Sequence, residues 1–332
     1  MQKPYFSLIV PVYNRPGEVE ELLQSISVQT VKNFEVILVE DGSTERSESV
    51  AAAYGEQLDL AYYFIPNGGP GPARNYGAGR ALGEYLVILD SDCILPSGYI
   101  AALCAELEAT GADAFGGPDR ASEHFTDIQK AINYAMTSFF TTGGIRGGGK
   151  ELDRFYPRSF NMGVRRSVFE ALGGFAPMRF GEDIDFSLRI YEAGYRVALF
   201  SSAWVYHKRR TDWRKFYRQV YNSGIARIHL YRKHPASLKP VHCLPAAFTV
   251  GEVFLLMGGV FCVWCLAPLL LYAVLVWADA GIRNRSFRIG GLSVAAACIQ
   301  LTGYGAGFLA GVWRRLLRKE GEFSAFEKTF YK

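Results

Sequence analysis

Two aspartates, Asp90 and Asp92, form a D-x-D pattern directly after the apolar run at residues 85–89 (YLVIL). A buried strand ending there would place both carboxylates at its carboxyl end. Mg²⁺ and Mn²⁺ take oxygen ligands and commonly bind through one or two carboxylates together with substrate phosphates. The pattern therefore indicates a divalent metal site that could stabilise charge on a departing diphosphate. A capped turn produces the same pattern, so the motif is weak when it stands alone.

A second acidic cluster, Glu40-Asp41-Gly42-Ser43, follows the apolar run at residues 34–39. A carboxylate here could accept hydrogen bonds from a nucleobase N–H group or a ribose hydroxyl. The competing interpretation is an Asx-type turn that leads into a helix. The residue types do not separate these two interpretations.

A third acidic cluster, Glu182-Asp183-Ile184-Asp185, opens a segment at residues 181–194 that has the cap pattern of a helix. A positioned carboxylate could take the proton from an attacking hydroxyl group. Acids in the first turn also stabilise a helix through its dipole, so capping is an equally serious interpretation. The catalytic interpretation predicts one carboxylate facing the crevice, whereas Ser or Asn would satisfy the capping interpretation.

Several further residues are of types that bind metal or phosphate. His207 ends the short run WVYH and could be a third metal ligand, although a lone His is more often structural. Asn14, Arg74 and Arg80 could hold phosphate or ribose. Arg80 would lie at a helix end, where it could equally be solvated.

The elements expected to position these residues alternate between strand and helix through the first ninety residues. Strands are predicted at residues 5–12, 34–39, 60–64 and 85–89, with helices at 17–28, 45–54 and 72–82. Their continuous apolar character is typical of parallel strands buried on both faces. Open α/β sheets bind ligands beyond the carboxyl ends of their strands, where the polar clusters fall. We therefore expect them to converge on one crevice.

Taken in order, these pieces resemble the family 2 glycosyltransferases, which have the GT-A fold. The matching segments, which cover residues 7–207, are SLIVPVYNRPGEVEELLQSISVQTVKNFEVILVEDGST, NGGPGPARNYGAGRALGEYLVILDSDC, FNMGVRRSVFEALGGF, GEDIDFSLRIYEAGYRV and VYH. The resemblance implies an α/β fold with a mostly parallel, Rossmann-like sheet and flanking helices. It also implies inverting transfer of a sugar from a nucleoside-diphosphate sugar.

The resemblance assigns roles to particular positions. The nucleotide-sugar site would comprise Pro11, Tyr13, Asn14, Glu40, Asp41, Arg74 and Asp90. Asp92 and Asp90, with His207, would hold the divalent metal, Mg²⁺ or Mn²⁺. Asp183 would be the general base, with Glu182 supporting it. Gln219 and Arg227, in FYRQVYNSGIAR, resemble the acceptor-side segment of membrane-attached members.

Two features refine the expected reaction. Glu40 stands where the family more often has Asp, which affects the fit of the ribose or base. The Q-x-x-R-W motif of processive members is absent, which favours addition of a single sugar. The acceptor expected from the resemblance is a glycan or a lipid-linked precursor of a polysaccharide.

Other functions fit less well. A nucleotidyltransferase would need a Gly-rich phosphate loop after the first strand, and a dehydrogenase would need G-x-G-x-x-G there, whereas this chain has PVYN. A catalytically inactive membrane scaffold of the same fold should have lost the acids that are present here. The net charge of +4 is too small to indicate nucleic acid as a partner.

The pattern of apolar and charged residues in the C-terminal quarter predicts membrane association. Residues 246–277 contain one charged residue, Glu252, and follow a basic run at residues 207–239 that could contact anionic lipid headgroups. Pro268 and the later arginines favour a hairpin at about residues 246–278 over a single span, because a hairpin keeps the cations on one side. Residues 289–313 are expected to be interfacial or re-entrant rather than a third span.

We therefore expect a catalytic domain at residues 1–240 and a membrane-associated region at residues 244–332. Within the catalytic domain, residues 1–95 would form the nucleotide-binding half and residues 96–240 the acceptor half. The six cysteines have no disulfide-framework spacing, and the first apolar run is too short for a signal peptide. These features predict a bacterial inner-membrane protein whose catalytic domain faces the cytoplasm.

Overall fold

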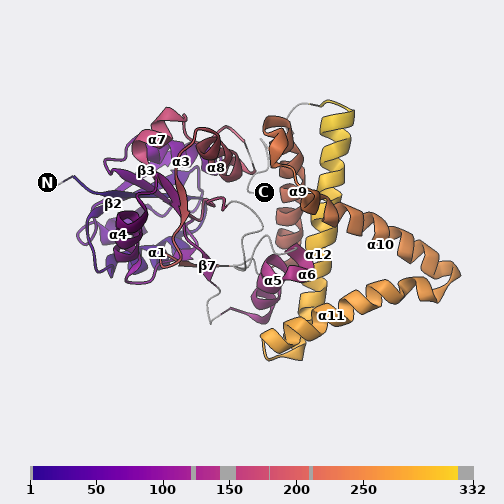
Figure 1. Ribbon diagram of the computed structural model, residues 1–332. Helices are drawn as coiled ribbons and strands as arrows, with labels where there is room; N and C mark the ends of the chain where they lie inside the picture. Colours follow the sequence, from indigo (N-terminus) through magenta and orange to yellow (C-terminus); the bar gives the residue numbers. More distant parts are fainter. Residues whose placement is uncertain (1–2, 121–124, 143–154, 179, 209–211, 321–332) are drawn as a thin grey trace. The chain divides into compact units, whose positions relative to one another are not determined.

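The computed structural model describes residues 3–120, 125–142, 155–178, 180–208 and 212–320. The chain forms two compact units. Among these residues, one unit contains 3–120, 155–178 and 180–208, and the other contains 125–142 and 212–320. Figure 1 labels their helices and strands.

The first unit is built on a seven-stranded sheet in the order β3-β2-β1-β4-β8-β6-β9. The strands are β1 (Phe6–Val12), β2 (Phe34–Asp41), β3 (Leu60–Ile65), β4 (Tyr85–Leu89), β6 (Ala114–Gly116), β8 (Asn161–Arg165) and β9 (Val197–Leu199). Strands β1 to β4 pair in parallel, whereas β8 runs antiparallel to both β4 and β6. The mostly parallel sheet confirms the expected GT-A class.

Helices cover both faces of this sheet. They are α1 (Pro16–Ser27), α2 (Glu48–Tyr54), α3 (Pro70–Ala78), α4 (Tyr99–Thr110), α7 (Arg166–Ala171) and α8 (Glu182–Glu192). In Figure 1, α1 and α4 lie on one side of the sheet, and α3, α7 and α8 lie on the other.

Alternate residues of each strand enter separate cores. Leu8 and Val10 of β1 belong to the core that also contains Leu22 of α1, while Ile9 belongs to the core that contains Phe186 of α8. Successive strand side chains point to opposite faces, so a sheet covered on both sides needs apolar residues at every position. This is why the strand sequences are almost continuously apolar.

A second, three-stranded sheet brings residue 207 next to residue 93. It has the order β5-β10-β7, formed by β5 (Cys93–Ile94), β10 (Val205–His207) and β7 (Asp119–Arg120). His207 of β10 is paired with Cys93 of β5 in antiparallel register.

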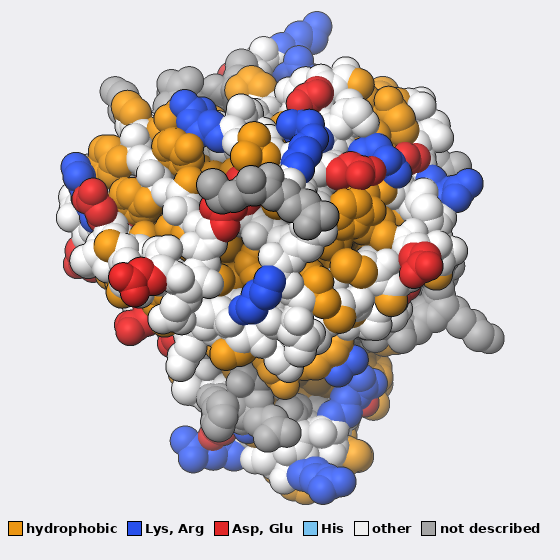
Figure 2. Space-filling view, turned by 90° about the vertical axis from the view of Figure 1, so that its left-hand side faces the viewer, with side chains coloured by type: hydrophobic (Ala, Val, Ile, Leu, Met, Phe, Trp, Pro, Cys, Tyr) orange, Lys and Arg blue, Asp and Glu red, His pale blue; other side chains and the backbone are white. Residues whose placement is uncertain are grey.

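On the face of the molecule in Figure 2, Lys and Arg side chains are interspersed with Asp and Glu, as is typical of a solvated surface.

The second unit is helical. It contains α5 (Asp127–Thr137), α6 (Phe139–Thr142), α9 (Trp213–Lys233), α10 (Leu244–Phe261), α11 (Ala267–Arg283) and α12 (Phe287–Gly311). Short 3₁₀ turns lie at Pro235–Ser237, Pro240–Cys243 and Val263–Leu266, and a π-helical turn, Val312–Leu317, follows α12. Pro268 lies in the first turn of α11, so the long apolar stretch is two helices. Figure 1 shows α10 and α11 meeting at an apex and α9 running beside α12.

Among the described residues, three helices are long and apolar enough to cross a membrane, at Pro240–Phe261, Val263–Arg283 and Phe287–Leu317. The two compact units do not coincide with the division expected near residue 240. Helices α5 and α9 group with the apolar helices because their buried faces pack on α12. Phe216 and Val220 of α9 share a core with Ile132 of α5 and Ala296 of α12.

Close packing in the main sheet gives a direct stability test. A Cβ added at Gly163 of β8 would lie 1.9 Å from Cζ of Phe115, whose ring is stacked on Phe200 at 4.3 Å. We expect Gly163→Ala to lower the free energy of unfolding by about 1–3 kcal/mol through overpacking. Thermal unfolding in detergent measures the change.

Gly17→Ala is the matched control. A Cβ at Gly17 meets nothing within 4 Å, so this variant should unfold within a few degrees of the wild type. Equal midpoints for Gly163→Ala and the wild type would contradict the packing described.

Candidate active site

The candidate residues of the first unit gather where the parallel strands end. Asp90 follows β4, and Asp92 precedes β5 by one residue. The pairing of β5 with β10 brings His207 to the same place from 115 positions further along the chain. The sheet topology thus assembles the D-x-D pair with the lone histidine.

The imidazole of His207 lies near both aspartates. Nε2 of His207 lies 3.1 Å from Oδ1 of Asp92 and 3.9 Å from Oδ2 of Asp90. The imidazole is stacked on the ring of Phe160 at 5.0 Å, which fixes its plane. Asp92 is 8% exposed, so its carboxylate is largely removed from water. Oxygen and imidazole donors at this spacing suit a hard or borderline divalent cation.

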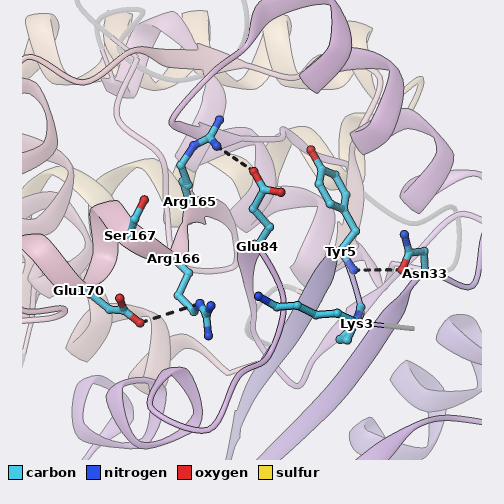
Figure 3. A pocket seen from close by; sticks show the side chains of 9 residues that line it. Lys3, Tyr5, Asn33, Glu84, Arg165, Arg166, Ser167 and Glu170 are labelled. Carbon is cyan, nitrogen blue, oxygen red and sulfur yellow. Dashed lines mark hydrogen bonds and ion pairs between the residues drawn. The ribbon is translucent and has the colours of Figure 1, made fainter. Parts of the chain in front are cut away.

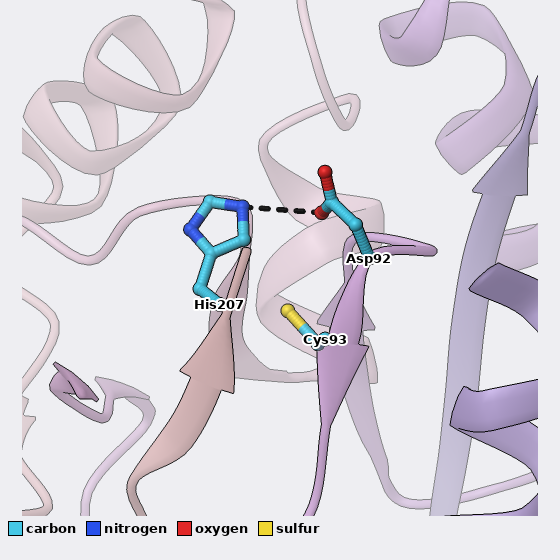
Figure 4. A group of neighbouring side chains, drawn as sticks. All are labelled: Asp92, Cys93 and His207. Carbon is cyan, nitrogen blue, oxygen red and sulfur yellow. Dashed lines mark ion pairs between the residues drawn. The ribbon is translucent and has the colours of Figure 1, made fainter. Parts of the chain in front are cut away.

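Cys93 is the third member of a potential ligand group with Asp92 and His207, as Figure 4 shows. Its thiol is fully buried and donates a hydrogen bond to the Phe160 carbonyl at 3.4 Å. Burial, reinforced by the charge of Asp92, raises the pKa of the Cys93 thiol well above its ordinary value. Because only the thiolate is a good ligand, Asp90 is the better partner for Asp92 and His207.

Arg15 is a residue of the site that the sequence analysis did not identify. Its Nη1 lies 2.5 Å from Oδ2 of Asp92. Arg15 immediately precedes α1, so the same loop after β1 that carries Tyr13 and Asn14 supplies a cation to the carboxylate cluster.

Arg74 connects the aspartates to the acids of α8. Its Nη2 lies 3.1 Å from Oδ1 of Asp90, and its Nη1 lies 2.6 Å from Oε1 of Glu182. Only 3% of Arg74 is exposed. The guanidinium group is therefore a buried bridge between Asp90 and Glu182, and its expected place in the nucleotide pocket stays a prediction.

Glu182 and Asp183 occupy the first turn of α8 after Gly181, and both are buried. Burial raises the pKa of Glu182 to about 7, with Arg74 opposing the rise and Asp183 adding to it. Burial also opposes ionisation of Asp183, but Arg158, Arg74 and the Ile184 N–H group together outweigh it and hold the pKa of Asp183 below its ordinary value. The neighbouring carboxyl groups are thus tuned in opposite directions.

Arg158 is the second residue that the sequence analysis did not identify. Its Nε donates to Oδ2 of Asp183 at 2.7 Å. The other oxygen of Asp183 accepts from the Ile184 N–H group at 2.8 Å, inside the first turn of α8. Asp183 therefore takes part in the helix terminus and in an ion pair at once.

The expected nucleotide-contacting acids Glu40 and Asp41 are completely buried and organise loops. Oε2 of Glu40 accepts from the Ser47 N–H at 2.8 Å and from the Tyr62 hydroxyl at 3.2 Å. Asp41 accepts from the N–H groups of Gly68 and Gly69 at 2.7 and 2.9 Å. These contacts follow the turn interpretation of the cluster.

Asn14 ties the loop after β1 to the loop after β2. Its Oδ1 accepts from the backbone N–H groups of Thr44 and Glu45 at 2.8 and 2.9 Å, and its φ is +51°. Pro11 and Tyr13 flank this turn and are partly buried. Arg80, in contrast, is exposed beyond the end of α3, with its guanidinium over the ring of Tyr76.

Gln219 and Arg227 lie on α9, in the second unit. Gln219 is exposed, whereas Arg227 is partly buried. The helix buries an apolar face that includes Phe216, Val220 and Ile228.

A pocket of about 320 Å³ lies at the opposite end of the strands, near the start of β1 and β4. Figure 3 shows its side chains, with Arg165 paired with Glu84 at 2.8 Å and Arg166 with Glu170 at 3.9 Å. None of the predicted site residues lines it. We place the candidate site at the carboxyl ends of the strands because the metal-binding and acid–base groups are there.

The chain belongs to glycosyltransferase family 2, because the model of that family, glycosyl transferase family 2, matches residues 7–173, half of the chain. It is 25% identical over 328 residues to the succinoglycan biosynthesis protein ExoA of Rhizobium meliloti, a match covering 93% of this chain and 94% of the relative. A match to an uncharacterized glycosyltransferase of Rickettsia typhi reaches 42% identity but covers 27% of each chain, so this chain spans about a quarter of that relative's length.

Two solved structures share the fold. A mannosyltransferase from Pyrobaculum calidifontis, in complex with GDP-Man and Mn²⁺, superposes with a TM-score of 0.57 at 20% identity, covering 96% of this chain and 89% of the other. Residues 1–349 of TarS from S. aureus, in complex with UDP, give a TM-score of 0.51 at 18% identity, covering 96% and 93%. These similarities show the GT-A fold.

The buried bridge at Arg74 yields a stability prediction. Arg74→Met would leave Asp90 and Glu182 without their shared cation, and breaking a buried pair typically costs about 3–5 kcal/mol. We expect a loss of that order in the free energy of unfolding, measured by chemical denaturation near pH 8, where Glu182 is largely ionised.

Arg166→Met is the control, since Arg166 pairs with the exposed Glu170 at 3.9 Å and such surface pairs contribute about 1 kcal/mol or less. If the two variants were destabilised equally, Arg74 would not be the bridge described.

Proposed function

We propose that this glycosyltransferase moves a sugar, with inversion at the anomeric carbon, from a nucleoside-diphosphate sugar to an acceptor hydroxyl, using a divalent metal and a carboxylate base. The observation that carries the proposal is the continuous set of contacts from Asp92 through His207, Asp90 and Arg74 to Glu182. It connects the candidate metal ligands with two buried acids whose pKa values are shifted in opposite directions, and perturbed pKa values are common at functional sites.

The donor would lie over the loops that follow β1, β2 and β3. Asn14, Glu40 and Asp41 would act by fixing these loops, because their oxygens bind backbone N–H groups. Pro11 and Tyr13 would form part of the surface against the nucleotide. The complexes of the fold relatives with UDP and with GDP-Man support a nucleotide donor.

Asp90, Asp92 and His207 would hold Mn²⁺ or Mg²⁺, and the Mn²⁺ in the Pyrobaculum structure supports this choice. When bound, the ion supplies positive charge against the diphosphate as it leaves. Arg15 adds a further cation beside the same carboxylates. The imidazole donor favours Mn²⁺, which accepts nitrogen ligands more readily than Mg²⁺.

Asp183 would take the proton from the acceptor hydroxyl as its oxygen bonds to the anomeric carbon and the bond to the diphosphate breaks. Attack from the face opposite the diphosphate inverts that carbon. Arg158 keeps Asp183 ionised and orients one oxygen. Glu182 would support the base by holding Arg74 in place.

The acceptor would be a lipid-linked or polysaccharide precursor, with one sugar added per reaction. The similarity to a succinoglycan biosynthesis protein supports a polysaccharide product, and the three apolar helices support attachment to the bacterial inner membrane. Gln219 and Arg227 would contact the acceptor from α9. The catalytic unit would face the cytoplasm, where nucleotide sugars are made.

The general-base assignment predicts that Asp183→Asn loses activity while keeping its fold. Asn retains an oxygen that can accept from the Ile184 N–H, but it is far too weak a base. Turnover at saturating donor and acceptor should fall about a hundred- to ten-thousandfold, with little change in the thermal midpoint. Glu182→Gln should reduce turnover less. A stable Asp183→Asn variant with more than about a tenth of normal turnover would remove Asp183 from the mechanism.

The metal assignment predicts that Asp92→Asn weakens nucleotide binding only when a divalent metal is present. The carboxylate would act through the ion, so titrations of UDP and GDP by calorimetry, with Mn²⁺ and with a chelator, should differ for the wild type and converge for the variant. Equal affinity of the wild type under both conditions would contradict this role for Asp92.

A further inference from the structure

Helix α12 meets the length and hydropathy criteria for a membrane span but is covered differently from α10 and α11. Within the apolar window of the α12 segment, 44% of residues are buried inside the unit, against 6% and 17% for the α10 and α11 segments. A helix that faces lipid along its length should keep most of its apolar surface exposed. What covers α12 therefore decides whether it can cross a bilayer.

Helix α9 lies against the C-terminal half of α12 at backbone contact. A Cβ at Gly307 would fall 2.0 Å from the Tyr221 carbonyl oxygen, and a Cβ at Gly224 would fall 2.2 Å from the Tyr304 carbonyl oxygen. Further along, a Cβ at Gly311 would lie 3.0 Å from Cγ1 of the Ile228 side chain. Glycines on both helices thus allow the two backbones to approach more closely than larger residues would permit. Separating α9 from α12 would break this close packing.

The N-terminal half of α12 is covered by α5. Arg288 forms an ion pair with Asp127 at 3.4 Å, and Ala296 packs in a core with Ala131 and Ile132. Tyr134 of α5 donates a hydrogen bond to Asp279 of α11 at 2.7 Å. Polar helices therefore accompany α12 from one end to the other.

The outer surface of α9 is cationic at the level of the middle of α12. Phe216 packs in the core that contains Ala296, and its neighbours Arg214, Lys215 and Arg218 are exposed. Ala296 is nine residues beyond Phe287, about 14 Å along the helix at 1.5 Å per residue. In a hydrocarbon layer about 30 Å thick, a spanning α12 would hold these cations near the centre, where charged side chains are most costly.

We propose that α12 does not cross the membrane, and that α5, α9 and α12 form one layer lying along its surface while only the α10–α11 hairpin enters the lipid. The hairpin suits this role, since no charged residue occurs between Glu252 and Asp279. Phe261 and Trp264 at its apex are 90% and 79% exposed. Cations beside the apolar hairpin are the arrangement expected at an anionic membrane surface.

The surface layer fixes the sidedness of three points in the chain. The N-terminus, the α11–α12 connection at Asn284–Arg285 and the segment after α12 must all lie on one side of the membrane. A spanning α12 would place the last two on opposite sides. This inference does not depend on the proposed reaction.

The test uses Arg285→Cys and Arg318→Cys in the full chain, expressed in a bacterial host and probed with a membrane-impermeant maleimide. Both positions are exposed. Labelling in inside-out vesicles should exceed labelling in right-side-out vesicles by at least tenfold at both positions. The wild type, with its native cysteines, supplies the background, and an N-terminal fluorescent fusion marks the cytoplasmic side.

Labelling of Arg285→Cys and Arg318→Cys from opposite sides would overturn the proposal, because the chain would then cross the membrane between them. Labelling of both from the side opposite the N-terminus would also overturn it, since the hairpin would not return the chain to its starting side. Replacement of Gly17 by Cys, in the first unit, serves as a matched variant of known side.

Discussion

The buried guanidinium of Arg74 is the interaction on which the candidate site depends. It forms ion pairs with Asp90, at the end of β4, and with Glu182, at the start of α8. It belongs to α3, which precedes both acids in the sequence. Removing a charge from water is costly, so a 3% exposed arginine is tolerated only where it meets carboxylates at hydrogen-bond distance. The two acids are therefore held in fixed positions by the same group.

Fixing those acids also sets the charge of the site. Four carboxylates, those of Asp90, Asp92, Glu182 and Asp183, contact three arginines, Arg15, Arg74 and Arg158. With His207 neutral and all four acids ionised, the cluster has an excess of negative charge. A divalent cation would reverse that sign, and a diphosphate would then be attracted. The cluster is thus suited to bind the metal and the donor together better than either alone.

Much of this arrangement could be predicted from local sequence. The strand at residues 85–89 is an unbroken apolar run, and the strand at residues 34–39 is apolar except for Glu35. Asp90, Asp92 and Asp183 stand next to element ends that such patterns locate. Arg15 and Arg158 could not be found in this way, since their partners are 77 and 25 residues away and an arginine leaves no periodic signal. The roles of Glu40 and Asp41 were ambiguous because a carboxylate at a strand end can bind either a ligand or the next loop. Which of the two it binds depends on the position of that loop in the folded chain.

The division of the chain into two compact units could not be predicted from the sequence for a different reason. Helix α5 is 11 residues long with one apolar side, which on its own describes any surface helix. Its partner, α12, lies about 160 residues later. The glycines that let α9 pack closely on α12 cannot be recognised from a hydropathy pattern.

The consequence of that packing concerns the acceptor. Gln219 and Arg227, proposed to contact it, belong to a helix that is inseparable from α12 and hence from the lipid-entering hairpin. An acceptor anchored in the membrane would reach these side chains without leaving the surface, whereas a soluble glycan would gain nothing from their location. The location of α9 in the second unit therefore supports the proposed lipid-linked acceptor, provided that Gln219 and Arg227 have the acceptor role that the family resemblance implies.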